Sequence, residues 1–200
     1  ASTYEILVDG AKAESCIVTT PYENLHILPS SLDLAAAELE ISDKKGRESI
    51  LKNALLPIKQ YYDYIIIDCP PSLGLITTNA LTASDTFLVP IQCEYYALEG
   101  LTQLMSTVRR IKRQYNNTID IEGVLLTMYD GRLNLTQQVV EEVKKFFPRK
   151  VFKTVIPRGV RLSEAPSFGM PVIYYDKNCK GSITYTELAK EIIAKERSYE

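Results

Sequence analysis

Residues 64–71 read Tyr-Ile-Ile-Ile-Asp-Cys-Pro-Pro, and this stretch is the strongest local indication of the fold class. Three successive isoleucines are typical of a strand buried on both faces, and the two prolines force the chain out of that strand. Ligands of open α/β sheets bind beyond the carboxyl ends of strands, where this pattern predicts Asp68. A carboxylate there can hold Mg²⁺ through water. Taken alone, the pattern also fits a strand-end Asp that caps the next turn.

Strand-sized apolar runs alternate along the chain with segments of helical periodicity. The predicted strands are residues 25–28, 64–68, 86–91, 121–128 and 151–156, with 172–174 as a further possibility. Predicted helices cover about residues 98–111, 139–147 and 188–193, and Pro57 predicts a break in a helix over 50–61. This alternation predicts an α/β fold, a largely parallel open sheet flanked by helices, in a single domain over residues 1–200.

Composition and charge narrow the function classes. The chain is 46% hydrophobic, yet no run approaches the roughly 20 apolar residues of a membrane-spanning helix, and no signal peptide opens it. The four cysteines lack metal-site spacing, which favours free thiols in a reducing cytoplasm, and His26 is expected on a strand face. Residues 1–100 carry a charge balance of −8 and residues 101–165 one of +6. This asymmetry favours a face for a polyanion, although charge runs usually form only a solvated surface.

The acidic strand is the first of a set of motifs that occur in a fixed order. They lie at residues 65–74, 78–81, 89–90, 92–100, 123–128, 155–158 and 161–167, the last reading Arg-Leu-Ser-Glu-Ala-Pro-Ser. In this order and spacing they resemble the Soj/ParA family of partition ATPases, deviant relatives of the P-loop NTPases. The resemblance runs from about Tyr4 to the last helix. It implies a deviant P-loop NTPase-like fold and a role in chromosome or plasmid segregation.

The phosphate-binding loop of that family is not found in these residues. A G-x-x-x-x-G-K-[ST] pattern would supply backbone N–H groups and a lysine to the phosphates, but the nine glycines are scattered. Lys180-Gly181-Ser182 has the wrong order. By resemblance, Ala1 falls after the Walker A loop and the first strand or strands, as in an N-terminally truncated member. We therefore expect this chain alone to bind ATP very weakly, without measurable turnover, and to self-associate through open strand edges.

The resemblance also assigns roles to nucleotide-site residues. Asp68 corresponds to the Walker B acid, which is catalytic and linked to Mg²⁺. Residues 70–74 correspond to a nucleotide-sensing switch, although ordinary turn chemistry also explains Pro70, Pro71, Ser72 and Gly74. Pro157 and Arg158 correspond to the loop that lines the adenine, with Thr127 nearby. A strand-end Thr is more often structural, so both readings of Thr127 stay open.

The resemblance to the Soj/ParA family also implies DNA contacts. Arg132 and Arg161 match positions where the family binds DNA non-specifically on a sandwich dimer, and guanidinium groups suit phosphate oxygens without reading bases. No helix-turn-helix or zinc-finger pattern is present, so sequence-specific recognition is not expected.

Three functions are compatible with these observations. The first is an ATP- and Mg²⁺-dependent homodimeric partition ATPase on the nucleoid in the cytoplasm, regulated by a ParB/Spo0J-like partner. The second is a non-catalytic DNA-binding or interfering fragment that does not respond to ATP. The third is the related membrane-associated division-site ATPase, whose last helix is basic and amphipathic. Residues 187–200 carry a balance of −1, so no membrane partner is expected.

Overall fold

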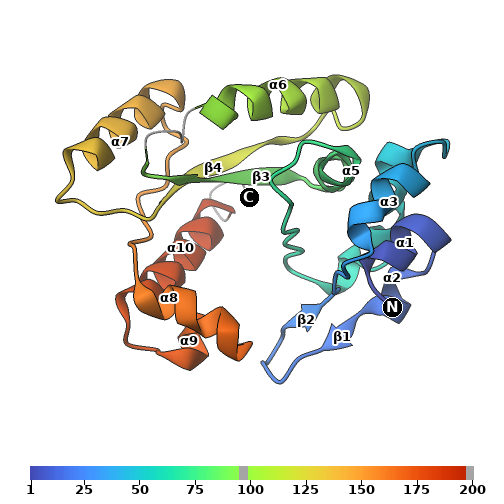
Figure 1. Ribbon diagram of the computed structural model, residues 1–200, viewed down its shortest axis with the longest axis horizontal. Helices are drawn as coiled ribbons and strands as arrows, with labels where there is room; N and C mark the ends of the chain where they lie inside the picture. The colour runs from blue at the N-terminus through green and yellow to red at the C-terminus, as the bar shows by residue number, and fades with distance from the viewer. Residues whose placement is uncertain (95–98, 197–200) are drawn as a thin grey trace. The chain divides into compact units, whose positions relative to one another are not determined.

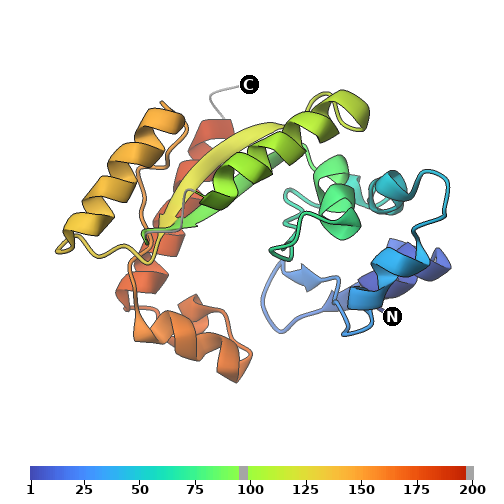
Figure 2. The same cartoon turned by 45° about the horizontal axis from the view of Figure 1, so that its top comes forward.

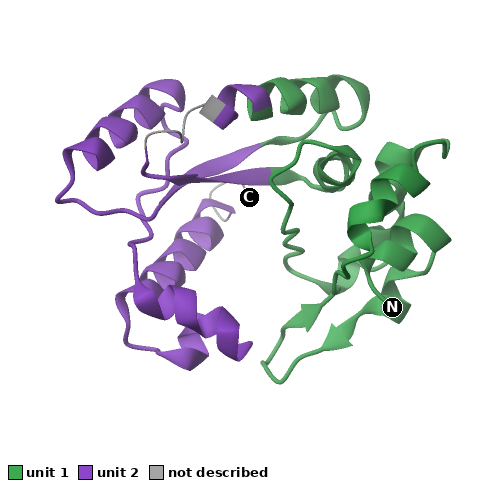
Figure 3. Cartoon of the chain, viewed as in Figure 1, with its two compact units in different colours: residues 1–86, 104–120 green, residues 87–103, 121–200 purple. Residues whose placement is uncertain are grey.

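The structure, a computed structural model, describes residues 1–94 and 99–196. They fall into two compact units (Figure 3): unit 1 comprises residues 1–86 and 104–120, and unit 2 residues 87–103 and 121–200. The boundary runs through helix α6 (Glu99–Gln114). The division leaves the prediction of a single domain untested, since two compact units can belong to one domain.

Short helices make up most of unit 1 (Figure 1). They are α1 (Thr3–Asp9), α2 (Ala13–Cys16), α3 (Leu34–Glu40), α4 (Ile50–Leu55) and α5 (Leu75–Ala83), with 3₁₀ turns η1 (Arg47–Ser49) and η2 (Lys59–Tyr61). A capping box of Ser2 and Glu5 begins α1, and Gly10, at φ 72°, ends it. Strand β1 (Val18–Thr19) pairs antiparallel with β2 (His26–Ile27), which confirms the strand position of His26. The core contains Ile6, Leu7, Ala13, Cys16, Leu51, Leu55 and Ile58.

Unit 2 is built on two longer strands, β3 (Thr86–Gln92) and β4 (Asp120–Thr127), whose first residues belong to unit 1. Its other elements are α7 (Asn134–Phe146), α8 (Val160–Glu164), η4 (Ala165–Phe168), α9 (Val172–Tyr175) and α10 (Lys180–Glu196). A third segment, residues 151–157, lies parallel to β4 through two isolated bridges, from Val124 to Val151 and from Tyr129 to Pro157, where a continuous strand is predicted over 151–156. Helices α7 and α10 lie on opposite sides of the strands (Figures 1 and 2). A parallel sheet flanked by helices confirms the predicted α/β class.

Packing explains a glycine in β4. A Cβ at Gly123 would lie 2.5 Å from Cε2 of the Phe152 ring, so only glycine leaves room for this ring. The Lys195 ammonium lies 4.4 Å from the centroid of the same ring and also forms an ion pair with Glu122. Phe152 joins Leu125, Ile156 and Leu188 in the core of unit 2. The glycine therefore brings the third segment close to β4.

Two predicted strands are wrong. Residues 64–68 are not assigned to a strand, and Ile66 is 90% exposed, because no described segment forms a ladder beside them. Residues 172–174 form the one-turn helix α9, because Pro171 precedes it and its carbonyl accepts from Tyr174 N and Tyr175 N. By contrast, the break predicted at Pro57 is confirmed: α4 ends at Leu55, before the turn η2.

Candidate functional site

Asp68 stands in an exposed, irregular stretch of unit 1. Its carboxylate forms no hydrogen bond or ion pair with a described residue, so it is open to a cation. The neighbouring Cys69 thiol has a raised pKa, first because nearby protein atoms desolvate it and second because Asp68 is negatively charged. The acid predicted to bind Mg²⁺ is thus accessible.

The turn after Asp68 is held by groups from two helices of unit 1. Glu38, in α3, accepts a hydrogen bond from Ile76 N at 3.0 Å, so its carboxylate lies at the first turn of α5. A Cβ at Gly74 would collide with this carboxylate. Thr77 Oγ1 donates to the Ser72 carbonyl at 2.6 Å. Glu38 and Thr77 therefore hold the end of the predicted switch segment, and no sequence pattern singles out Glu38.

Asn79 gives the motif at residues 78–81 a structural role. Its side chain is fully buried, and Oδ1 accepts from Leu51 N at 3.1 Å. Its Nδ2 donates to the carbonyls of Arg47 at 2.7 Å and Leu75 at 3.0 Å. One amide thus joins η1, α4 and α5, as expected for a buried polar group whose hydrogen bonds are satisfied.

Thr127, Pro157 and Arg158 come together in unit 2. Thr127 ends β4, its carbonyl accepts from Cys93 N at 3.0 Å, and Arg158 N donates to the Tyr129 carbonyl at 3.4 Å. Pro157 forms the bridge to Tyr129 at the same end of the sheet. The Arg158 guanidinium pairs with Glu94 at 2.7 Å. Strand ends that converge in this way are where open α/β sheets bind ligands.

Arg132 is held by a carboxylate two residues before it. Its Nε and Nη2 donate to the two oxygens of Asp130 at 2.9 and 2.6 Å, although the arginine side chain is 89% exposed. These hydrogen bonds lower the pKa of Asp130 to about 2. The pair stays charged throughout the neutral range, so the arginine can reach a phosphate only by leaving this carboxylate.

Arg161 is also paired, in a larger network. Its Nη1 contacts Glu164 at 2.9 Å, and its Nε lies 3.4 Å from Asp176. The guanidinium carbon sits 5.9 Å from the centroid of the Tyr175 ring, whose hydroxyl donates to Glu164 at 3.1 Å. Arg161 therefore ties α8 to α9 and to the residue that follows α9, whatever else it binds.

The predicted residues divide between the units. Asp68 lies in unit 1, while Thr127, Arg132, Pro157, Arg158 and Arg161 lie in unit 2. The structure shows Thr127, Pro157 and Arg158 close together within unit 2. Their assigned roles stay predictions.

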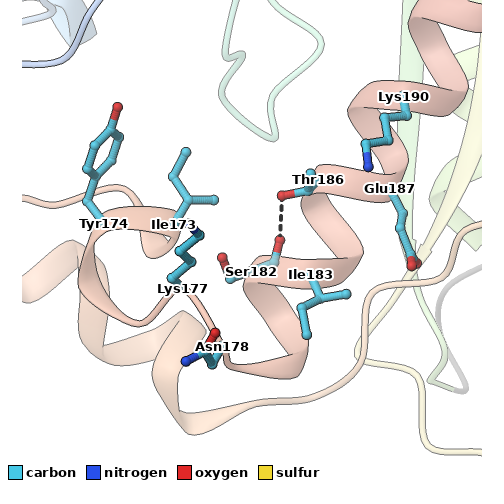
Figure 4. Close-up of a pocket in the computed structure, with 9 residues that line it drawn as sticks. All are labelled: Ile173, Tyr174, Lys177, Asn178, Ser182, Ile183, Thr186, Glu187 and Lys190. Carbon is cyan, nitrogen blue, oxygen red and sulfur yellow. Dashed lines mark hydrogen bonds between the residues drawn. The ribbon is translucent and has the colours of Figure 1, made fainter.

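A groove between α9 and α10 has a volume of about 620 Å³ (Figure 4). Its lining is mixed, with no cluster of catalytic type: Ile173, Tyr174, Lys177, Asn178, Ser182, Ile183, Thr186, Glu187 and Lys190. The nearby Gly181 packs closely against Leu162 of α8. Within Lys180-Gly181-Ser182, the glycine thus serves helix packing.

The described part of the chain contains neither a group of three or more potential metal ligands nor a helix that could span a membrane. Within residues 1–94 and 99–196, no three His, Cys, Asp or Glu side chains are grouped as metal ligands. Over the same residues, no helix has the length and apolar character needed to cross a bilayer.

Comparisons with known proteins agree with the motif order. Residues 1–121 match a family model described as an AAA domain. The chain is 59% identical over 191 residues to the sporulation initiation inhibitor protein Soj of Bacillus subtilis, covering 96% of this chain and 76% of that protein. It is 47% identical to the chromosome-partitioning ATPase Soj of Treponema pallidum, covering 98% and 77%.

A solved structure gives the same fold. Cobyrinic acid a,c-diamide synthase of Mycobacterium smegmatis, with an ATP analogue and magnesium bound, superposes with a TM-score of 0.84 at 32% identity, covering 100% of this chain and 74% of that one. The fold, the motif order and the identity to two Soj proteins lead to one conclusion. The chain belongs to the Soj/ParA family of chromosome-partitioning ATPases.

Proposed function

We propose that this chain carries the magnesium-linked, adenine-lining and DNA-contacting parts of an ATP-dependent partition switch. The observation that carries the proposal is the convergence of Thr127, Pro157 and Arg158 at one end of the sheet, in a chain 59% identical to a Soj protein. In the intact switch, ATP would hold a homodimer on nucleoid DNA in the cytoplasm. A ParB/Spo0J-like partner would trigger hydrolysis and release.

The donor chemistry fits Mg²⁺ and one side of a nucleotide. The free Asp68 carboxylate would hold the metal through water, and Thr127, Pro157 and Arg158 would line the base. Bound Mg²⁺ would neutralise phosphate charge. Neither a glycine-rich loop nor its lysine is found in these 200 residues to cradle the phosphates. We therefore expect weak nucleotide binding and no turnover by this chain alone.

ATP hydrolysis tests this part of the proposal. The 200-residue chain and the Bacillus subtilis Soj relative are assayed side by side with Mg²⁺ and DNA. We expect phosphate release by this chain to equal the rate without protein, because nothing orients the γ-phosphate. Turnover at the rate of the relative would show that these residues form a complete site.

DNA contact is proposed for Arg132 and Arg161, which would exchange their carboxylate partners for backbone phosphates. Arg161→Ala should lower affinity for duplex DNA and flatten its salt dependence by about 0.9 in the log–log slope, the value for one phosphate contact. An unchanged slope would remove Arg161 from the DNA surface. A DNA-binding fragment that does not respond to ATP is the second candidate, favoured because the phosphate loop was not found.

A further inference from the structure

The second part of helix α6 gathers positive charge over a stretch that contains no Asp or Glu. Residues 104–114 read Leu-Met-Ser-Thr-Val-Arg-Arg-Ile-Lys-Arg-Gln and lie in unit 1. We call Arg109, Arg110, Lys112 and Arg113 the α6 basic patch; all four side chains are exposed. Its three arginines, together with Ser106 and Gln114, line a groove of about 220 Å³. The groove thus offers guanidinium, hydroxyl and amide groups to one ligand.

These cations differ in their pairing from the arginines assigned to DNA and nucleotide contacts. None of the four forms an ion pair with a described residue, whereas Arg132, Arg158 and Arg161 each contact a carboxylate within 2.9 Å. Arg109 and Arg113 are four residues apart, a spacing at which like charges destabilise a helix. An anion bound across the patch would remove this repulsion, and it would not have to displace an internal partner first.

The patch stands on a fixed support. Val108 and Ile111 are buried on the other face of the helix. Just beyond the end of α6, Asn116 Nδ2 donates to the carbonyls of Leu81 at 3.0 Å and Ser84 at 2.7 Å. A lipid surface would need the apolar face of a basic amphipathic helix for insertion, and here that face is already packed. The exposed ligand surface is therefore electrostatic.

We propose that the α6 basic patch is a sequence-independent contact for the phosphates of duplex DNA, additional to Arg132 and Arg161. This inference rests on the proposed DNA-binding function. Arg109 and Arg113 are separated by about 6 Å along the helix, and each DNA strand presents a phosphate about every 3.4 Å of duplex axis. Adjacent arginines can thus reach neighbouring phosphates. Guanidinium forks bind phosphate oxygens without reading base edges.

The test compares three variants of the full chain in binding to a short mixed-sequence duplex across a salt series. R109Q/R110Q/R113Q removes three patch charges. K12Q/K45Q/K52Q removes three exposed charges from the same unit, none of which is ion-paired to a described residue. R109K/R110K/R113K keeps the patch charge. Circular dichroism melting checks that all fold alike, and each titration is run with and without MgATP.

We expect the patch glutamine variant to flatten the log–log salt slope by up to about 2.7, or about 0.9 for each lost phosphate contact. The control variant should keep nearly the wild-type slope, and the lysine variant should keep most of it, because backbone contact depends mainly on charge. An equal slope for both glutamine variants would overturn the inference while leaving the roles of Arg132 and Arg161 standing.

Three other outcomes bear on the inference and on the proposed function. A wild-type chain that binds no duplex even at low salt would overturn both. Patch-dependent binding to vesicles containing phosphatidylserine, without patch-dependent binding to DNA, would overturn the DNA assignment in favour of a membrane surface. A missing response to MgATP would bear only on the nucleotide switch, because the patch contains no residue assigned to ATP.

Discussion

At the scale of single residues, we expect the pairing of arginines with carboxylates to determine how strongly the proposed surface binds DNA. Arg132 and Arg161 are exposed, yet Asp130 and Glu164 already occupy their guanidinium groups. An exposed ion pair contributes little to stability, so a phosphate can replace the carboxylate at modest cost. The acids would therefore set the strength of DNA binding, and their removal should increase it.

Asp130→Asn should raise affinity for duplex DNA by about 1.4- to 5-fold, the range that corresponds to one exposed ion pair. The depressed pKa of Asp130, about 2, keeps this carboxylate ionised well below neutral pH. Its contribution to folding is present above the unfolded-state pKa near 3.9 and is lost as pH falls toward 2. The affinity ratio of variant to wild type should thus be constant between about pH 5 and pH 8.

Fluorescence anisotropy with a labelled duplex measures both quantities. Asp43→Asn in unit 1 is the matched control, because it changes net charge equally at an exposed carboxylate without a described ion-pair partner. Equal gains in the two variants would mean that net charge, and not release of Arg132, determines the affinity.

At the scale of elements, Gly123 in β4 controls the approach of the third segment. Gly123→Ala places a methyl group 2.5 Å from the Phe152 ring and should lower the free energy of unfolding by about 1–3 kcal/mol. Gly100→Ala makes the same substitution in α6, where no atom lies within 4 Å, and should raise it by about 0.5–1 kcal/mol. Urea unfolding measures both, and a loss at Gly100 as large as that at Gly123 would contradict the packing argument.

The elements also show what a sequence can predict. Strand β4 and helices α6 and α7 were predictable because their apolar spacing reflects burial within one segment. The absence of a strand over residues 64–68 was not predictable, because a strand depends on a neighbour that its own residues do not specify. In the site, Asp130 and Glu164 lie two and three residues from their arginines and could have been noticed. Glu94, 64 residues from Arg158, could not.

At the scale of the whole molecule, the exposed run at residues 64–68 should drive self-association. Ile66 is 90% exposed and Ile65 39%, and exposed apolar segments outside any described sheet are templates for pairing between chains. Ile66→Lys should shift a concentration-dependent oligomer toward monomer in size-exclusion chromatography. Leu32→Lys, at a side chain 96% exposed elsewhere in unit 1, is the control. The same shift in both variants would point to general hydrophobic association.

We propose that these 200 residues carry the DNA surface of a Soj/ParA chain but not a complete ATP site. Duplex binding by the 200-residue chain, titrated with and without MgATP, tests it most directly. We predict salt-sensitive binding that is equal in both titrations, because the arginines and the α6 basic patch do not depend on a nucleotide. Binding that appears only with MgATP and is lost in Asp68→Ala would contradict the account.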